Sequence, residues 1–224
     1  MRLIYAKYSI DIELEENKVY VLSIENPEAY SDFLRELWSQ TKGIPGEIIL
    51  AEGEKVFEIS KLIDCIFNPF DLDCNEKRIM NKLFAELKEY ALANMVEENA
   101  QINSEMIQYV EKVVAAFPYA LDYAVEFDLV NLFKMYGICI KTGGETLLET
   151  IVDYLKIMKQ IGKVSCFVFV GLKSFLKKKE VELLYEFAFY EKIYIIIVES
   201  KHTPMLNNEK CWIIDNELCM IEPS

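Results

Sequence analysis

The chain has 224 residues, of which 52% are hydrophobic, and its formal net charge is −13 at pH 7. The hydrophobic content supports a packed core and excludes a disordered chain, and no apolar run approaches the roughly 20 residues that span a bilayer. The negative charge argues against general nucleic-acid binding, because contacts with phosphate need local positive charge. No signal-peptide core follows Met1, so we expect a cytoplasmic protein without membrane contact.

The first part of the chain alternates strand and helix signals. Residues 3–14 and 19–24 keep a rough two-residue hydrophobic period on either side of a polar run, which predicts an antiparallel hairpin. Asn26-Pro27 places an N-cap residue before a proline that suits the first helical position. A helix is therefore expected from this point, and Gly43 is expected to end it.

Residues 48–51 and 55–59 predict a second hairpin around a glutamate–glycine–glutamate turn. Beyond it, apolar residues recur every three or four positions, and Asn75 and Ser104 are suited to cap two successive helices. Almost no strand signal interrupts this pattern. Residues 61–137 are therefore predicted to form an α-helical leg domain, inserted into a domain of a different type.

The centre of the remaining chain is a strand–helix–strand unit. Residues 164–170 and 193–198 are apolar runs rich in Val, Ile and Phe, and they flank a segment of helical period at residues 177–190. Strands without a polar face are typical of parallel sheets that helices cover on both sides. The chain is therefore predicted to be α/β, with residues 1–60 and 138–224 forming a head domain around a mainly parallel central sheet.

Shorter signals complete the predicted head domain. Residues 138–140 are expected to bring the chain back to the sheet. Thr142 and Glu145 have the spacing of a capping box, and Gly162 is suited to end the helix that follows them. Residues 211–221 predict a terminal hairpin around an Asp-Asn turn.

The sequence lacks the motifs of common catalytic sites. It contains no GxxxxGK[ST] or GxGxxG phosphate-binding loop, so nucleotide binding is not expected. His202 is the only histidine, which excludes HExxH sites and most catalytic triads, and its position after a strand suits a solvated turn. The six cysteines form no CxxC pair and are expected to be buried, reduced thiols. An enzyme is therefore not predicted.

One group of oxygen-bearing side chains lies at the start of a short predicted helix. It consists of Asp122, Glu126, Asp128 and Asn131. Spacings of four and three bring such side chains together if the segment is helical, and Ca²⁺ binds several oxygen ligands. Alternatively, Asp128 caps the helix and compensates its dipole. The residues alone leave both interpretations open.

Basic side chains are concentrated in the second half of the chain. Residues 1–140 carry 13 basic and 25 acidic side chains, whereas residues 141–201 carry 10 basic and 8 acidic. Any DNA-facing surface should therefore draw mainly on the second of these segments. Within it, Lys156, Lys159 and Lys163 fall at spacings of three and four, on or near one helix face. Such a face suits either DNA or solvent.

Three successive lysines, Lys177, Lys178 and Lys179, stand where a helix should begin. Cations at this end oppose the helix dipole, at a cost of about 0.3–1 kcal/mol each. A bound anion such as phosphate would offset this cost. Solvation together with the glutamates nearby in the sequence is the alternative explanation.

Four stretches of the chain carry a resemblance to a known family. They are VLSIENPEAYSDFLREL at residues 21–37, NLFKMYGICIKTGGETLLETI at 131–151, VFVGLKSFLKKKEVELLYEF at 168–187 and IIDNEL at 213–218. In their order and spacing, and in the helical insertion between them, the chain resembles the small non-nuclease adaptation proteins of type II-A CRISPR loci, the ring-forming members of the Csn group. The resemblance spans nearly the whole length.

The resemblance implies an α/β head similar to a P-loop NTPase that has lost its phosphate loop, and a helical leg. It implies a homotetrameric ring with a positively charged hole, which binds Ca²⁺ and threads onto free ends of double-stranded DNA without known catalysis. Such proteins act in spacer acquisition beside the CRISPR integrase and the effector nuclease. Lys134 and Lys141 match basic positions of the family, whereas Lys177 replaces a capping threonine and the acidic run before Asn131 is sparser.

The leading hypothesis is therefore a non-catalytic, calcium-dependent ring that binds double-stranded DNA ends through lysines, without reading sequence. The alternative is an acidic protein-interaction scaffold for the CRISPR adaptation complex, in which DNA contact is incidental. A third hypothesis, an enzyme acting on DNA or a small molecule, is disfavoured by the missing motifs.

Overall fold

The computed structural model describes residues 1–222, so the last two residues of the predicted head domain lie outside the described part. The contacts divide the chain into a first unit, Met1–Cys74 with Thr142–Ser224, and a second unit, Asn75–Lys141. The second unit begins later than the predicted residue 61, because residues 63–66 form a strand in the sheet of the first unit.

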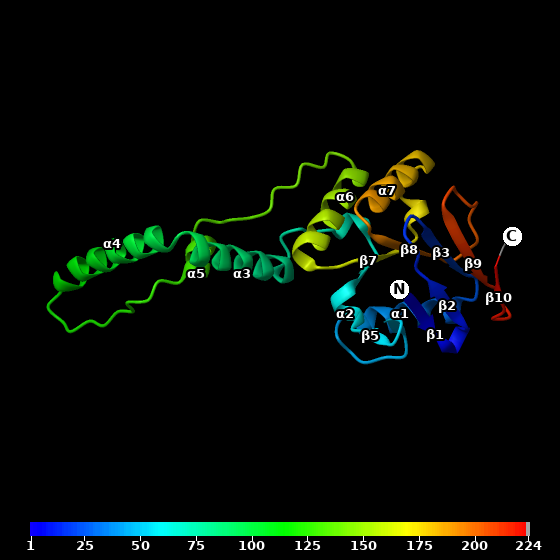
Figure 1. Ribbon diagram of the computed structural model, residues 1–224, viewed down its shortest axis with the longest axis horizontal. Coiled ribbons are helices and arrows are strands. Elements are labelled where there is room, and N and C mark those ends of the chain that lie inside the picture. The colour runs from blue at the N-terminus through cyan, green and yellow to red at the C-terminus, as the bar shows by residue number, and fades with distance from the viewer. Residues whose placement is uncertain (223–224) are drawn as a thin grey trace. The chain divides into compact units, whose positions relative to one another are not determined.

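A six-stranded sheet forms the centre of the first unit, in the order β10-β9-β3-β8-β7-β6 (Figure 1). All its neighbouring strands pair in parallel except β10, which runs antiparallel to β9. Its strands are β3 (Val19–Ile24), β6 (Ile63–Ile66), β7 (Cys166–Val170), β8 (Tyr194–Glu199), β9 (Glu209–Ile214) and β10 (Met220–Ile221). This mainly parallel sheet confirms the predicted α/β class.

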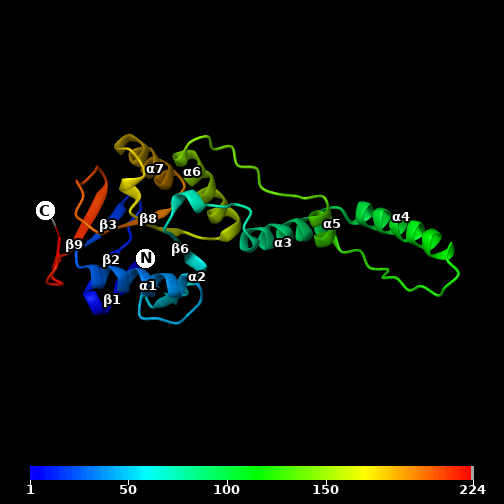
Figure 2. The same ribbon diagram turned by 180° about the vertical axis from the view of Figure 1, so that it is seen from behind.

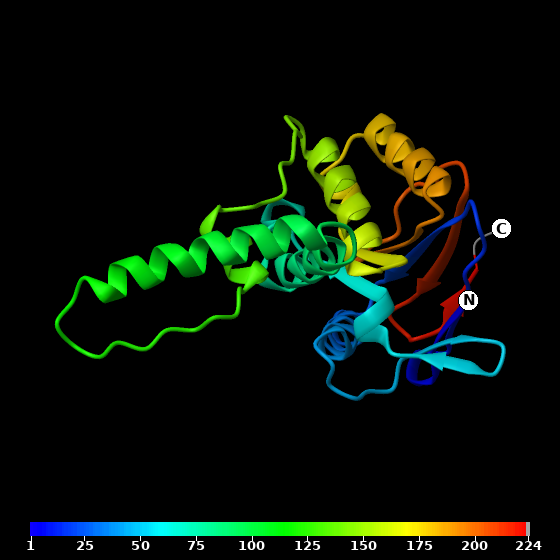
Figure 3. The same cartoon turned by 60° about the vertical axis from the view of Figure 1, so that its left-hand side comes forward.

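Helices cover both faces of this sheet, as a parallel sheet requires (Figure 3). One face packs against α1 (Pro27–Thr41), and the other against α6 (Leu147–Ile157) and α7 (Lys178–Tyr190). Short elements link the strands: η1 (Ala6–Tyr8), α2 (Ile59–Leu62), η2 (Pro69–Asp71), the π-helical turn η3 (Met158–Gly162) and η4 (Leu172–Ser174). The predicted β7–α7–β8 unit is thus confirmed.

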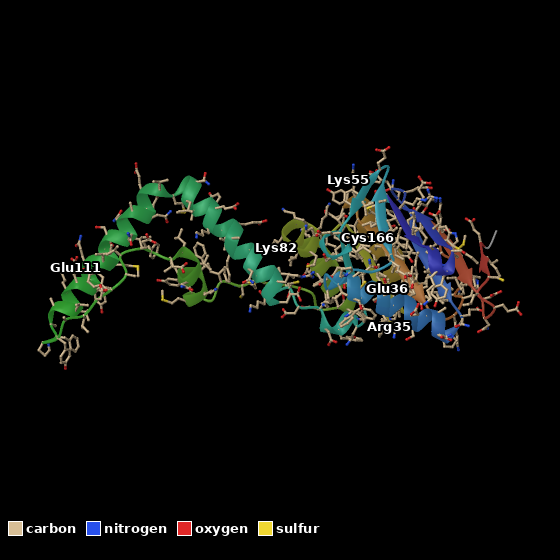
Figure 4. The ribbon with its side chains drawn as sticks, turned by 90° about the horizontal axis from the view of Figure 1, so that it is seen from below. Arg35, Glu36, Lys55, Lys82, Glu111 and Cys166 are labelled. Atoms are coloured by element: carbon tan, nitrogen blue, oxygen red, sulfur yellow. The ribbon has the colours of Figure 1, made fainter. Side chains whose placement is uncertain are left out.

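The register places apolar side chains side by side across the sheet. Val168 pairs with Ile196, which in turn pairs with Tyr20, and all three are at most 1% exposed. Cys166 lies in the same interior among densely packed side chains, whereas Lys55 stands at the tip of a hairpin (Figure 4). The core is therefore built on strands that have no solvent-facing side.

A smaller antiparallel sheet, in the order β2-β1-β4-β5, packs into the same core as α1. Its strands are β1 (Arg2–Tyr5), β2 (Ile10–Glu13), β4 (Ile49–Glu52) and β5 (Lys55–Phe57). The predicted second hairpin is confirmed as β4–β5. The predicted pairing of residues 3–14 with 19–24 is wrong: β1 pairs with β2, and β3 joins the larger sheet because all six of its residues are buried.

Helix ends follow the expected chemistry, although two of them are shifted. Asn26 Oδ1 accepts from the N–H groups of Glu28 and Ala29 at 3.0 Å, as predicted. The capping box before α6 is formed by Thr146 and Glu149 rather than by Thr142 and Glu145. The same Thr-x-x-Glu spacing occurs twice, and the second copy directly precedes the apolar face that α6 buries.

The end of α6 also differs from the prediction. The helix does not stop in a left-handed turn at Gly162 but continues into η3, and Lys163 adopts the left-handed conformation instead, with φ of 60°. Gly162 is buried against Met158, which leaves little room for a side chain there.

The second unit is α-helical, with α3 (Lys77–Asn94), α4 (Val96–Ala115) and α5 (Leu129–Met135). Asn75 does not cap α3: its side-chain amide pairs with the backbone N–H and C=O of Ile140, at 2.8 and 3.0 Å. Residues 138–140, predicted to return to the sheet, thus lie in this unit without strand structure. Ser104, predicted as a cap, lies inside α4.

The exposure of the cysteines is mixed. None of the six cysteines, all within the described residues, forms a disulfide; Cys74, Cys166 and Cys211 are buried, and burial raises the pKa of the Cys166 thiol to about 12. Cys139 and Cys219 are exposed, contrary to the prediction, because each lies in a segment without regular pairing. Within residues 1–222, no helix combines the length and apolar character needed to cross a bilayer.

One carboxylate ties α1 to the N-terminal strand region. Asp32 accepts hydrogen bonds from Lys7 Nζ at 2.7 Å, Tyr8 Oη at 3.1 Å, Tyr5 Oη at 3.2 Å and Arg35 Nη2 at 3.0 Å. These donors, led by Lys7, lower the pKa of Asp32 to about 2. The charged form of Asp32 is therefore part of the packing between α1 and the smaller sheet.

We predict that Asp32→Asn lowers the free energy of unfolding by about 2 kcal/mol at neutral pH, because the hydrogen bonds to a charged group are removed. The folded-state pKa is below the ordinary value of 3.8, so this stabilisation is present above about pH 4 and disappears as the pH falls towards 2. Urea unfolding at pH 7 and about pH 3 measures the difference between the variant and the original chain. Glu54→Gln, at an exposed turn residue, is the control, and a difference independent of pH would contradict the prediction.

Candidate nucleic-acid interface

The three lysines predicted on one helix face differ in whether their ammonium groups have partners. Lys156 is exposed on α6, and no partner is found for it among the described residues. Lys159 donates to the Glu191 carboxylate at 3.0 Å and to the Glu191 carbonyl oxygen, so it links η3 to the end of α7. Lys163 Nζ donates to the Gln160 carbonyl at 2.6 Å. The π turn changes the angular step along the helix, so the three ammonium groups do not form one regular row.

The three lysines at the start of α7 are all exposed. Glu180 Oε2 accepts from the Lys177 backbone N–H at 2.7 Å, and Lys178 Nζ lies 3.9 Å from Glu182 Oε1. Nearby glutamates were one of the two explanations for three lysines at the start of a helix. Glu180 and Glu182 of the same helix place negative charge at this end, where it offsets the unfavourable interaction between the lysines and the helix dipole. Lys179 has no partner among the described residues and is free to contact an external anion.

The predicted lysines are divided between the two units. Six lie in the first unit on α6, η3, the residue after η3 and the start of α7, and these helices lie side by side on one face of the sheet (Figures 1 and 2). Lys134, on α5, and Lys141 are exposed and belong to the second unit. Six of the eight predicted lysines therefore lie along α6, η3 and α7, together with the acidic residues Glu149, Asp153, Glu182 and Glu186 of the same helices.

The predicted calcium ligands separate into two groups. Asp128 caps α5: its Oδ1 accepts from the N–H groups of Val130 and Asn131 at 2.9 and 3.2 Å, and its Oδ2 accepts from the Asn131 side chain at 2.7 Å. Asp122 Oδ1 accepts from the N–H of Tyr123 at 2.9 Å. Asp128 therefore performs the capping role that the sequence left open.

The helical spacing assumed for Asp122 and Glu126 is wrong. Residues 118–127 contain no helix, because Pro118 follows the end of α4 and the chain then runs back along that helix (Figures 1 and 3). Tyr123 Oη donates to Glu111 Oε1 at 3.0 Å, which raises the pKa of the phenol and holds the returning segment against α4. Glu111 is labelled in Figure 4.

Across residues 1–222, no three His, Cys, Asp or Glu side chains are grouped so that they could hold a metal ion. The oxygen ligands of Asp122, Glu126, Asp128 and Asn131 suit Ca²⁺ by chemical type, but their arrangement in this conformation does not fit a calcium site. Of the four, Asp128 and Asn131 are joined by a side-chain hydrogen bond.

The turn that carries phosphates in many nucleotide-binding sheets is short in this chain. Two residues, Glu25 and Asn26, connect β3 to α1. The first N–H groups of α1 are satisfied by the side chain of Asn26, as described above. This connection has neither the glycines nor the free N–H groups with which a phosphate loop surrounds its anion.

A buried polar cluster was not apparent from the sequence. Lys173 Nζ lies 2.8 Å from Glu209 Oε1, and these side chains are 11% and 0% exposed. Tyr185 Oη donates to the same carboxylate at 2.6 Å, and burial raises the pKa of this phenol well above its ordinary value. The Lys173 backbone N–H donates to Glu199, whose pKa is also raised by burial. The cluster holds β9 against α7 and the turn after β7.

No local signal could have found this cluster. Glu209 opens an apolar strand and Lys173 lies in a turn 36 residues earlier, so only the parallel pairing of the strands brings them together. Its polar groups are satisfied within the protein, by one another and by the backbone of Pro204 and Leu206.

The sequence and the fold of this chain are similar to those of known proteins. A family model described as CRISPR-associated protein (Cas_Csn2) matches residues 40–218. The CRISPR-associated protein Csn2 of Enterococcus faecalis is 20% identical over 219 residues, covering 96% of this chain and 95% of that protein. Stu0660 of Streptococcus thermophilus has a similar fold, with a TM-score of 0.60 at 12% identity over 96% of this chain and 75% of that chain. The ATP-binding cassette MJ0796, bound to ADP and phosphate, gives a TM-score of 0.37 at 10% identity, which supports no conclusion.

We predict that Glu209→Gln lowers the free energy of unfolding by about 3–5 kcal/mol, because it leaves the buried Lys173 ammonium group without its ion-pair partner. The double variant Lys173→Met with Glu209→Gln should be less destabilised than the single variant, since the unpaired charge is gone. Thermal unfolding of both, beside the exposed control Glu186→Gln on α7, measures the effect. A double variant that is no more stable than Glu209→Gln would show that the ion pair is not the source of the destabilisation.

Proposed function

The chain belongs to the Cas_Csn2 family of CRISPR-associated proteins, and from this membership we propose that it acts in spacer acquisition by binding ends of double-stranded DNA without catalysis. It would do so in the cytoplasm, beside the CRISPR integrase and the effector nuclease. The missing phosphate loop and the single histidine support a binding role rather than an enzymatic one.

The observation that carries the DNA part of this proposal is the lysine-rich outer side of α6 and α7. The chain as a whole has a net charge of −13, yet Lys156 near the end of α6 and Lys178 and Lys179 at the start of α7 are exposed on two adjacent helices. Lysine contacts with phosphate are independent of sequence. A surface of this kind therefore fits a protein that recognises duplex DNA by its charge, with selectivity for ends arising from a closed ring.

Assembly into a homotetrameric ring is part of the proposal. Within the second unit, α4 buries none of its residues, although one of its faces is apolar. Ile102, Met106, Tyr109 and Val113 follow one another at spacings of four, three and four residues and are 41–69% exposed. An apolar stripe of this kind is typical of a helix that packs against another helix, so it supports contact between copies of the chain.

Calcium dependence also belongs to the proposal. Since the candidate ligands are not grouped in this conformation, calcium binding would require residues 116–127, which contain Asp122 and Glu126, to rearrange towards Asp128 and Asn131. Divalent cations would also reduce the repulsion between copies that each carry a charge of −13, and between these copies and DNA.

The second candidate function is a protein-interaction scaffold without specific binding of DNA ends. It is favoured by the acidic character of the chain, because residues 1–140 carry 25 acidic against 13 basic side chains. Under this alternative, the lysines of α6 and α7 would serve solubility.

We predict that the protein shifts linear duplex DNA in a gel-shift assay with calcium, whereas it does not shift a covalently closed circle of the same sequence. A closed ring can be loaded only over an end, and a chelator should weaken binding to the linear form. Equal binding to both forms, or binding to neither, would contradict end binding and leave the scaffold function as the better explanation.

The same assay tests the lysine surface. The combined change Lys156→Glu, Lys178→Glu and Lys179→Glu should weaken binding, and the slope of log K against log salt concentration should become shallower by about 0.9 for each phosphate that is no longer neutralised. Lys88→Glu, an exposed lysine of α3, is the matched control and should leave binding unchanged. Unaltered salt dependence in the triple variant would place the DNA-binding residues elsewhere.

We predict that Met106→Glu combined with Val113→Glu lowers the mass of the assembly, because two charges enter the apolar stripe of α4. Light scattering with and without chelator measures the mass, and circular dichroism checks that α4 stays helical. Ser104→Glu, on a more polar part of the same helix, is the control. An unchanged mass in the double variant would exclude this stripe as a contact between copies.

A further inference from the structure

The outer face of α1 carries an exposed tryptophan between two basic residues. Arg35, Trp38 and Lys42 lie at spacings of three and four on this helix, and the Trp38 side chain is 47% exposed, although Phe33 and Leu37 on the same helix are buried. Leu34, Arg35, Trp38 and Phe67 line a shallow cavity of about 450 Å³. We call Leu34, Arg35, Trp38, Lys42 and Phe67 together the Trp38 surface.

The five residues of the Trp38 surface include two cations, Arg35 and Lys42, and no carboxylate. Lys42 Nζ lies 6.0 Å from the centre of the Trp38 ring, and no ion pair is found for it among residues 1–222. The Arg35 side chain is 76% exposed and lies 3.0 Å from Asp32, a carboxylate that it shares with Lys7. Asp32 thus faces two cations, Lys7 and Arg35, and Lys42 is a third cation that is not paired with it. The surface is locally positive on a chain whose net charge is −13.

The apolar part of this surface continues past β6. Phe67 follows that strand directly and is 39% exposed, and three residues later Phe70 is 68% exposed, with its ring against that of Phe175 at 5.7 Å. Nearby on the same short segment, Asp71 is held by Asn68 at 2.7 Å. Besides Trp38 and Phe67, which share the cavity, the rings of Phe70 and Phe175 are therefore exposed on the segments that follow β6 and β7.

Exposed rings beside cations indicate contact with another molecule. Tryptophan and arginine are the side chains that most often dominate the energy of protein–protein contacts. Positive charge at the rim favours a negatively charged partner through complementarity. A nucleic-acid strand would need a longer track of cations and rings than this surface offers, so a protein partner fits it better.

We propose that the Trp38 surface is a docking site for an acidic protein segment that inserts an aliphatic or aromatic side chain between Trp38 and Phe67. The cavity is large enough for one or two such side chains, and Arg35 and Lys42 contact the carboxylates that flank them. This surface does not include the lysines of α6 and α7, so it operates whether or not those lysines bind DNA.

The chain contains its own reporter for this contact. Trp38 and Trp212 are its two tryptophans, and Trp212 stacks on Tyr20 at 5.9 Å. In a Trp212→Phe background, which keeps a ring against Tyr20, Trp38 emission is titrated with a synthetic peptide of alternating acidic residues and Leu or Phe. Two further peptides replace the acidic residues with Lys, or Leu and Phe with Ala. A saturable change with the first peptide alone is the expected result.

Two variants test the residues in turn. Lys42→Glu should weaken binding of the acidic peptide about tenfold or more and improve binding of the Lys peptide. Trp38→Ala should weaken binding of the acidic peptide by a similar factor, and calorimetry measures this binding because the variant lacks the fluorescent Trp38. Tyr190→Ala is the matched control, because Tyr190 is 85% exposed on α7 without this arrangement of cations. Retention of linear DNA should be unchanged in all three, which separates this proposal from DNA-end binding.

Three outcomes would overturn the docking site. The first is that no peptide changes Trp38 emission, and the second is that all three peptides change it equally. The third is that a single-stranded oligonucleotide changes it and the acidic peptide does not. The last result would assign the surface to nucleic acid.

Discussion

The constraint on which the rest of the structure depends is that a parallel sheet must be covered on both faces. In the first unit, β3, β7 and β8 are almost completely buried, so α1 and the smaller sheet cover one side and α6 and α7 the other. No interior surface is left for a ligand in the centre of the sheet. Within the first unit, the outer sides of the covering helices, where Trp38 and Lys156 lie, are therefore available for contacts with other molecules.

Local chemistry was predictable from the sequence, and long-range pairing was not. Asn26-Pro27, the β4–β5 turn and the β7–α7–β8 unit each depend on residues close together in the chain, and all were predicted. The partners of β3 were not, because β8 and β9 lie about 175 to 190 residues later in the sequence. The capping box before α6 was misplaced by four residues, since two copies of the motif compete and only burial of the helix distinguishes them.

The candidate site was predictable in residue type more than in arrangement. Exposure of Lys156 and Lys179 follows from the polar face of their helices, but the binding of Lys159 to Glu191 depends on the π turn that follows α6. Asp128 was correctly recognised as a possible cap, whereas the expected helix through Asp122 is absent from the described chain. The Lys173–Glu209 pair depends wholly on the tertiary fold. Sequence patterns thus identify which side chains face water, and the fold decides which of them are free.

The cysteines have a practical consequence. Burial raises the thiol pKa at Cys166 and Cys211, so that these groups are almost entirely protonated at neutral pH and react slowly with electrophiles. Cys139 and Cys219 are exposed, and one belongs to each unit. The natural sequence therefore offers a pair of selective attachment points for a donor and an acceptor dye. Energy transfer between them would report changes in the distance between the two units.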